Sequence, residues 1–221
     1  MIEQSAAIKC PTVALQLAGA KKVQQVLAEP GRLEAFLGRG ATASTLLPRP
    51  VAALAEVDAA ALRESFTALY PLDDSAIGRE AQQLALAHPE RFVLKPQREG
   101  GGNNVYRGDI PPALAAMAER DKSKAEGEPR EREGYILMDL ILPPQGKEAV
   151  MVRGGAGEGV RGEVVSELGV YGVALFGTSD DGGAEVLANE TVGHLLRTKG
   201  VESDEGGVAV GYSVIDGVLL V

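Results

Sequence analysis

Apolar residues recur at three- and four-residue steps through the first part of the chain, which is the spacing of amphipathic helices. The spacing predicts helices over Lys21–Glu29 and from about Ala52 to Tyr70. Asp73-Asp74-Ser75 offers N-caps for a third helix ending near His88, and Pro111-Pro112 suits the first turn of a fourth that runs to Arg120. The first ninety residues are therefore predicted to be mainly helical.

The pattern changes from Tyr135 onward, where short apolar runs are separated by glycine-rich turns. These runs predict strands of an antiparallel sheet: Tyr135–Leu142, Ala149–Arg153, Glu163–Phe176 and Ala184–Leu187. The tract Asp121–Gly134 mixes both signs of charge without an apolar period, so we expect an exposed connection there. Helices first and strands after, with one earlier strand at Phe92, indicate an α+β fold.

The segment from Arg91 to Tyr106 carries the densest candidate chemistry. An extended Phe92–Lys95 would turn Phe92 and Leu94 to a core and Lys95 to the other side. Three glycines then allow backbone N–H groups to approach a ligand closely, Lys95 adds a positive charge, and Glu99 offers an oxygen ligand suited to Mg²⁺. The segment predicts a nucleotide-phosphate site; the alternative is a flexible surface loop after an edge strand.

Composition narrows the class of protein. The 221 residues are 45% hydrophobic and 24% charged, enough apolar material for a core, and the net charge of −9 argues against a nucleic-acid partner. No apolar run reaches the roughly 20 residues that a membrane span needs, so no membrane partner is expected. A single cysteine, Cys10, fits a reducing compartment; we expect a cytoplasmic protein and a buried, structural Cys10 rather than a catalytic thiol.

Several motifs together resemble one known family, the eukaryotic-type glutathione synthetases. The segment Phe92–Asn104 resembles the family's phosphate loop almost letter for letter, and four further blocks follow in the family's order. These blocks are Lys9-Cys10-Pro11 with Gln16–Gln25, Ser166–Val173, Gly193–Lys199 and Gly206–Ala209. The resemblance covers essentially the whole chain.

The resemblance implies an ATP-grasp fold, in which a nucleotide lies between two α+β lobes. Residues 1–90 would be the mainly helical portion, and residues 91–221 would carry the phosphate loop, the sheet and a substrate loop. Only the C-terminal part of the longer family members is matched. We therefore expect the N-terminal substrate-binding part to have no counterpart in this sequence.

Site residues follow from the same resemblance, motif by motif. The ATP-contacting positions would be Lys21, Lys95, Pro96, Gln97, Arg98, Glu99, Gly100, Gly101, Gly102, Asn103, Asn104, Tyr106, Met138, Asp139, Leu140, Ile141, Glu167, Lys199 and Glu205, with Glu99 also holding Mg²⁺. Asp139-Leu140 departs from the family's usual Glu-Lys at the adenine hinge. Arg197, Val208 and Ala209 would contact the peptide substrate, and Lys95, Arg197 and Lys199 would be catalytic.

The implied reaction joins glycine to γ-glutamylcysteine at the expense of ATP. The dipeptide carboxylate attacks the γ-phosphorus to give an acyl phosphate, and the amine of glycine then displaces phosphate to yield glutathione. Two alternatives stay open: a sister ligase that uses another amine, such as β-alanine or serine, and a nucleotide-binding fragment without activity. The family is typically homodimeric.

Overall fold

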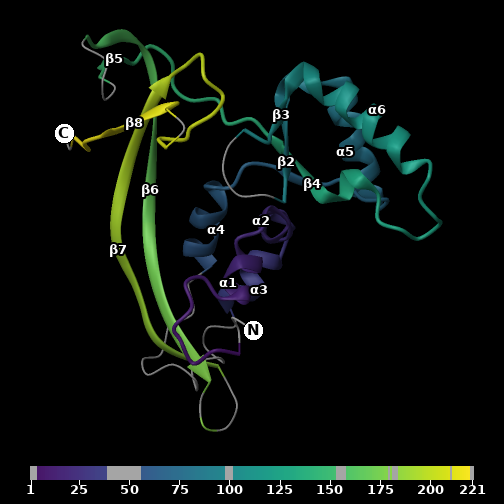
Figure 1. The fold of residues 1–221 in the computed structure, drawn as a ribbon, viewed down its shortest axis with the longest axis horizontal. Coiled ribbons are helices and arrows are strands. Elements are labelled where there is room, and N and C mark those ends of the chain that lie inside the picture. Colours follow the sequence, from purple (N-terminus) through teal and green to yellow (C-terminus); the bar gives the residue numbers. More distant parts are fainter. Residues whose placement is uncertain are drawn as a thin grey trace. The chain divides into compact units, whose positions relative to one another are not determined.

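The structure is a computed structural model that describes residues 4–38, 56–97, 102–152, 158–178, 180, 184–209 and 211–219. The chain divides into two compact units. Unit 1 comprises Met1–Gly38, Leu54–Glu99 and Asn103–Ile141, and unit 2 comprises Arg39–Ala53, Gly100–Gly102 and Leu142–Val221. Figure 1 shows the helices gathered in unit 1 and a long two-stranded ribbon in unit 2.

Unit 1 contains all six α-helices of the described part of the chain. They are α1 (Val13–Ala18), α2 (Lys21–Ala28), α3 (Arg32–Gly38), α4 (Glu56–Glu64), α5 (Ala76–Ala87) and α6 (Ile110–Asp121), with short 3₁₀ turns η3 (Pro89–Arg91), η4 (Arg107–Asp109) and η5 (Glu131–Gly134). The predicted helices at Lys21, Asp73 and Pro111 are confirmed. Ser75 caps α5 as expected, because its Oγ accepts a hydrogen bond from the Gly78 N–H at 3.0 Å.

The helix predicted from Ala52 to Tyr70 is wrong in its second half. α4 ends at Glu64, where the N–H groups of Ser65 and Phe66 bond to the carbonyls of Leu62 and Arg63 in a closing turn. Leu69–Pro71 forms strand β1, which pairs with Ile136–Met138. The apolar spacing alone could not distinguish these two states, because the strand is stabilised by a partner far along the sequence.

One antiparallel sheet organises unit 1. Its strands lie in the order β1-β4-β2-β3, with β2 at Phe92–Pro96, β3 at Val105–Tyr106 and β4 at Tyr135–Asp139. Phe92, Leu94 and Leu137 are fully buried on one face, where they pack in a cluster with Ala81 and Ala85 of α5 and Ile110 of α6. The core predicted under Phe92 and Leu94 is therefore confirmed.

The opposite face of this sheet carries Lys95 and its neighbours. Directly paired residues project to the same side of a sheet, and every second residue of a strand projects to the same side. That face therefore carries Val93 and Lys95 of β2 together with their partners Tyr106, Ile136 and Met138. α2 contacts both β1 and β4. Helices α5 and α6 thus form the core on one side, while the candidate residues Lys95, Tyr106 and Met138 lie on the other.

A second antiparallel sheet, in the order β5-β6-β7-β8, forms unit 2. β5 spans Glu148–Met151, β6 Val160–Thr178, β7 Ala184–Gly200 and β8 Ser213–Asp216. The antiparallel strands predicted near Ala149, Glu163 and Ala184 are confirmed in this sheet, whereas the strand predicted from Tyr135 is β4 of the other sheet, because it pairs there with β1 and β2. β7 runs on past Leu187 to Gly200, because it stays paired with β6 through two register shifts.

Two further expectations need correction. Asp121, predicted in an exposed connection, is 6% exposed, since its carboxylate accepts the Glu131 N–H and lies 2.7 Å from Lys124 Nζ. Cys10 is exposed rather than buried, because the adjoining helix α1 buries no residue against which Cys10 could pack. No helix in the described ranges has the length and apolar character to cross a bilayer.

Candidate functional site

The candidate residues fall into one set in each unit. Unit 1 contains Lys21, Lys95, Pro96, Gln97, Asn103, Asn104, Tyr106 and Met138 to Ile141, and unit 2 contains Glu167, Arg197, Lys199, Glu205, Val208 and Ala209. Gly102 is described, whereas Arg98, Glu99, Gly100 and Gly101 lie outside the described residues. The chemistry of each unit is set by its own residues.

In unit 1, the start of α2 lies beside the end of β2. The Lys22 N–H, in the first turn of α2, donates to Gln97 Oε1 at 3.1 Å, so that Lys21 and Lys95 are attached to neighbouring backbone segments. Lys22 Nζ lies 4.0 Å from Asp73 Oδ2. A helix N-terminus and two lysines in one neighbourhood favour an anion such as a phosphate.

Strand β3 returns the chain to β2 after the glycine-rich segment. Tyr106 pairs with Val93 and Val105 with Leu94, and Asn104 Nδ2 donates to Tyr106 Oη at 3.0 Å. Gly102 has a φ of +83°, which favours glycine. The two ends of the predicted phosphate loop are thus held on adjacent strands of one sheet.

The predicted adenine hinge, Met138–Ile141, uses several of its backbone groups internally. The Asp139 N–H donates to Ala68 O at 3.0 Å, and the Leu140 N–H donates to Arg91 O at 2.8 Å. The Asp139 carbonyl accepts from Thr67 Oγ1 at 3.4 Å, and its carboxylate lies 3.4 Å from Arg91 Nη2. These bonds hold the hinge against the segment before β1 and the start of β2.

In unit 2, three charged side chains meet on one face of the sheet. Glu167 on β6 lies directly opposite Arg197 on β7, and its carboxylate is 2.7 Å from Arg197 Nη2 and 3.4 Å from Lys199 Nζ. Lys199 is 8% exposed and also donates to the carbonyl of Asp204 at 3.2 Å. Two cations beside one carboxylate leave a net positive charge, which suits an anionic ligand. We call Glu167, Arg197 and Lys199 the anion cluster.

The glycine loop between β7 and β8 lies against the anion cluster. A Cβ on Gly206 would stand 2.9 Å from Glu167 Oε2, so the backbone approaches this carboxylate more closely than a side chain would allow. Gly206 and Gly207 carbonyls accept from Ser213 Oγ at 2.9 Å and from the Tyr212 N–H at 2.9 Å. The loop that contains Glu205, Val208 and Ala209 is thereby attached to the start of β8.

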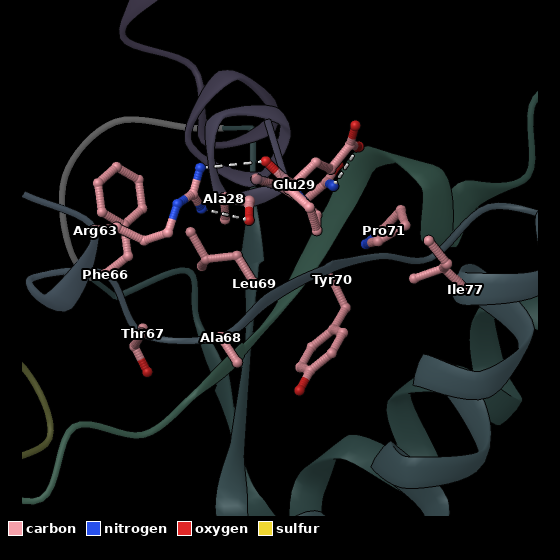
Figure 2. Close-up of a pocket in the computed structure, with 12 residues that line it drawn as sticks. Ala28, Glu29, Arg63, Phe66, Thr67, Ala68, Leu69, Tyr70, Pro71 and Ile77 are labelled. Atoms are coloured by element: carbon pink, nitrogen blue, oxygen red, sulfur yellow. Dashed lines mark hydrogen bonds between the residues drawn. The ribbon is translucent and has the colours of Figure 1, made fainter. Parts of the chain in front are cut away.

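Unit 1 also contains a cavity of about 360 Å³. Figure 2 shows it lined by Phe66, Leu69 and Tyr70, with the Arg63 guanidinium donating to the carbonyls of Ala28 and Glu29 at one side. No predicted site residue lines it. The cavity nevertheless adjoins the predicted hinge, because two of its lining residues, Thr67 and Ala68, are hydrogen-bonded to Asp139.

The described residues offer no ready-made metal centre. They contain no group of three or more His, Cys, Asp or Glu side chains placed to hold a metal ion. Glu99, the predicted Mg²⁺ ligand, lies outside the described residues, and the Glu167 carboxylate is engaged by two cations.

Comparison with known sequences identifies the family. A sequence model described as eukaryotic glutathione synthase, ATP binding domain, matches residues 4–220. The chain belongs to this family. Among curated relatives, the glutathione synthetase of Xenopus laevis is 42% identical over 221 residues, covering 100% of this chain and 40% of the relative. The family resemblance of the sequence motifs is thus confirmed.

Further relatives agree. A chloroplastic glutathione synthetase of Arabidopsis thaliana is 42% identical, over 100% of this chain and 34% of the relative. The Homo sapiens glutathione synthetase is 41% identical, over 98% of this chain and 39% of the relative. Among solved structures, a glutathione synthetase-like effector of Globodera pallida in the apo form covers 97% of this chain and 37% of its own, at 24% identity and a TM-score of 0.59. The last comparison supports the fold; the chain spans about 40% of the Xenopus relative's length.

Sequence motifs did not reveal which side chains support the candidate residues. Gln97 stays a predicted nucleotide contact, and the structure adds that its Oε1 accepts the N–H of Lys22, 75 residues away. The bonds that attach the glycine loop to Ser213 were likewise not predicted. No local signal marks such partners, because each depends on pairing between distant strands or helices.

Proposed function

We propose that this chain binds ATP and ligates glycine to γ-glutamylcysteine through an acyl phosphate, producing glutathione. The observation that carries the proposal is the family match over residues 4–220, supported by curated glutathione synthetases at about 42% identity along the whole chain. The chain spans about 40% of the Xenopus relative, so activity and substrates are inferred from the family.

In this proposal, unit 1 binds the nucleotide. Lys21 and Lys95 neutralise phosphate oxygens, together with the N-terminus of α2. Adenine would be held by Met138, the Leu140 carbonyl and the Ile141 N–H, because Asp139 is occupied by Arg91, Thr67 and Ala68. Support comes from the shared sheet face of Lys95, Tyr106 and Met138.

In unit 2, the anion cluster binds the charged groups of the reactants. Arg197 suits a peptide carboxylate, because its guanidinium can donate two parallel hydrogen bonds, and Lys199 suits a phosphate oxygen as a compact charge. Glu167 holds Arg197 and Lys199 in place before an anionic reactant binds to these two side chains. Val208 and Ala209, in the loop attached to Ser213, would contact the peptide.

Catalysis in this scheme is alignment and charge neutralisation. The cations orient the dipeptide carboxylate towards the γ-phosphorus and stabilise the charge that develops on the transferred group. ADP leaves, the glycine amine attacks the acyl carbon, and phosphate departs as the amine loses a proton. When bound, Mg²⁺ would neutralise phosphate charge, with Glu99 as its proposed protein ligand.

The proposal is tested by offering the purified chain MgATP, γ-glutamylcysteine and an equimolar mixture of glycine, β-alanine and serine. The mass of the product identifies the amine, and the proposal predicts that glutathione dominates. A product that contains β-alanine or serine would indicate the sister ligase instead.

The second candidate function is nucleotide binding without ligation. The observation that favours it is the coverage of only 34–40% of the relatives' length. In that case ATP would bind, and its binding would weaken in Lys95→Ala, but no amide product would form. Calorimetric titration with ATP separates this outcome from a chain that binds no nucleotide. We retain a homodimer and a cytoplasmic location as predictions, although one relative is named as chloroplastic.

A further inference from the structure

Strands β6 and β7, which carry the anion cluster, and the neighbouring β8 form a sheet with two distinct faces near the glycine loop. Arg197 pairs with Glu167 on one side and with Ile215 on the other, and Lys199 pairs with Val165 and Ser213, so these residues share the front face. Ser166, Thr198 and Asp216 project to the opposite, back face, because successive residues of a strand alternate. Thr198 thus lies between the two cations in sequence but points away from both.

A directed chain of hydrogen bonds crosses the back face. Thr198 Oγ1 lies 2.7 Å from Asp216 Oδ2 and must donate to it, because a carboxylate only accepts. Thr198 then accepts from Ser166 Oγ at 3.0 Å, and Ser166 accepts from Lys147 Nζ at 3.3 Å. The chain runs from a cation to an anion through two hydroxyl groups. The pKa of Asp216 is lowered chiefly by the hydrogen bond from the Thr198 hydroxyl and then by a separate bond from the Gly217 N–H.

Apolar burial does little to set the register of β8. This strand has only four residues; of its two apolar ones Val214 is half-buried and Ile215 is 66% exposed, so a slip along β7 would expose limited additional apolar surface. Thr198, by contrast, is 2% exposed, and any slip would leave its hydroxyl without its carboxylate. The polar chain therefore discriminates between registers where the hydrophobic pattern does not.

The register of β8 also determines where the glycine loop ends. Ser213, the first residue of β8, donates from Oγ to the Gly206 carbonyl at 2.9 Å and lies beside Lys199 in the sheet. Gly206 in turn lies against Glu167. A displacement of β8 would consequently move the loop away from the anion cluster.

We propose that Thr198 and Asp216 are positioning residues: their hydrogen bond, extended by Ser166 and Lys147, fixes β8 and the glycine loop against Glu167, Arg197 and Lys199. The relevance to catalysis rests on the proposed function of that cluster. Neither residue touches a reactant in this scheme; both act through the strand register.

Two variants of Thr198 separate the hydroxyl from its shape. Thr198→Val keeps the branched side chain but removes the donor and the acceptor, whereas Thr198→Ser keeps the hydroxyl and leaves a small void. Thr191→Val, at an exposed position of the same strand, is the control. Hydrogen exchange of the amides of residues 211–216 and the dissociation constant for ATP are measured for each full-length variant.

The proposal predicts that Thr198→Val accelerates exchange in residues 211–216 about tenfold or more and weakens ATP binding by a similar factor, as expected for loss of a charge-assisted hydrogen bond. In Thr198→Ser and Thr191→Val, both the exchange rates and the dissociation constant for ATP should stay within about threefold of those of the unmodified chain, a difference of less than 1 kcal/mol. If packing mattered instead of the hydroxyl, Thr198→Ser would be the more damaged variant, and the proposal would be overturned.

The two measurements also separate this proposal from the proposed function. If the hydrogen-exchange rates of residues 211–216 are unchanged in Thr198→Val, Thr198 does not position β8 and the proposal is overturned, whatever the affinity for ATP. If exchange accelerates but the affinity for ATP is unchanged, the Thr198–Asp216 bond holds β8 without affecting nucleotide binding, and its proposed positioning role for the anion cluster is overturned. If the unmodified chain binds no ATP, the proposed function fails, while the exchange data still decide whether Thr198 and Asp216 hold β8.

Discussion

Leu94 and Lys95 are neighbours on β2 but project to opposite faces of the same sheet, so their replacement should have opposite consequences. Leu94→Ala should lower the stability of unit 1 and leave the ATP affinity of the folded chain unchanged. Lys95→Ala should lower the ATP affinity and leave the stability nearly unchanged. The pair tests whether β2 separates the core from the site.

The magnitude for Leu94 follows from its burial. The side chain is fully buried against Phe92, Leu137 and helices α5 and α6, and no part of it lies at the surface. Truncation of such a leucine to alanine costs about 2–5 kcal/mol, which combines lost transfer free energy with the cavity left behind. With a urea dependence of about 2 kcal/mol per molar, the unfolding midpoint should fall by about 1–2.5 M.

The magnitude for Lys95 follows from a charge-assisted hydrogen bond. Loss of one such bond to a phosphate is worth about 1.5–3 kcal/mol, which is roughly a 10- to 150-fold increase in the dissociation constant for ATP. Urea unfolding followed by circular dichroism reports stability, since the chain has no tryptophan, and calorimetric titration reports affinity.

The control is Lys122→Ala, which removes the same charge from a lysine side chain that is 71% exposed in unit 1. It should change neither quantity appreciably. Equal ATP affinities for Lys95→Ala and Lys122→Ala would refute the placement of Lys95 in the nucleotide site. A midpoint shift below about 0.3 M in Leu94→Ala would refute the assignment of that face to the core.

Three further predictions concern unit 1. Gly78→Ala should lower the melting temperature, although alanine usually stabilises a helix by about 1 kcal/mol, because the new Cβ would clash with the Asp73 carbonyl oxygen. Gly134→Ala is the control, because the space around Gly134 is open. A higher melting temperature for Gly78→Ala would contradict this packing. Arg63 donates two hydrogen bonds to Glu34 and lowers the pKa of that carboxyl from 4.5 to about 2. The stability that this ion pair contributes is therefore complete above pH 4.5 and is lost as the pH falls through 2. Glu34→Gln should flatten the acid dependence of the melting temperature between these pH values, and an unchanged pH profile would count against the ion pair. Ser75→Ala should destabilise α5 by about 1 kcal/mol through loss of its N-cap, measured by urea unfolding, and a neutral result would show that Ser75 Oγ contributes nothing there.

Elements whose signals are local could be predicted from the sequence. The beginning of α5 is set by Ser75 and its end by His88, and β2 ends at Pro96, which lacks a backbone N–H to continue the ladder. Helix α6 likewise begins at its prolines. In each case the residues that determine the boundary lie within the element itself or beside it.

Features that depend on distant partners could not be predicted in this way. Leu69 becomes part of a strand because Met138 lies beside it, and Lys22 meets Gln97 only after α2 packs near β2. The polar chain through Thr198 exists because three strands are brought into register. The candidate site itself was found through family motifs, which identify the residues but not the side chains that hold them.

The most direct test of the proposed ligase is ADP release by the purified, folded chain with MgATP, in the presence and absence of γ-glutamylcysteine and of glycine, together with mass detection of glutathione. The proposed function predicts ADP release that requires both substrates and matches the amount of glutathione formed. A folded chain that binds ATP yet releases no ADP with both substrates present would contradict it.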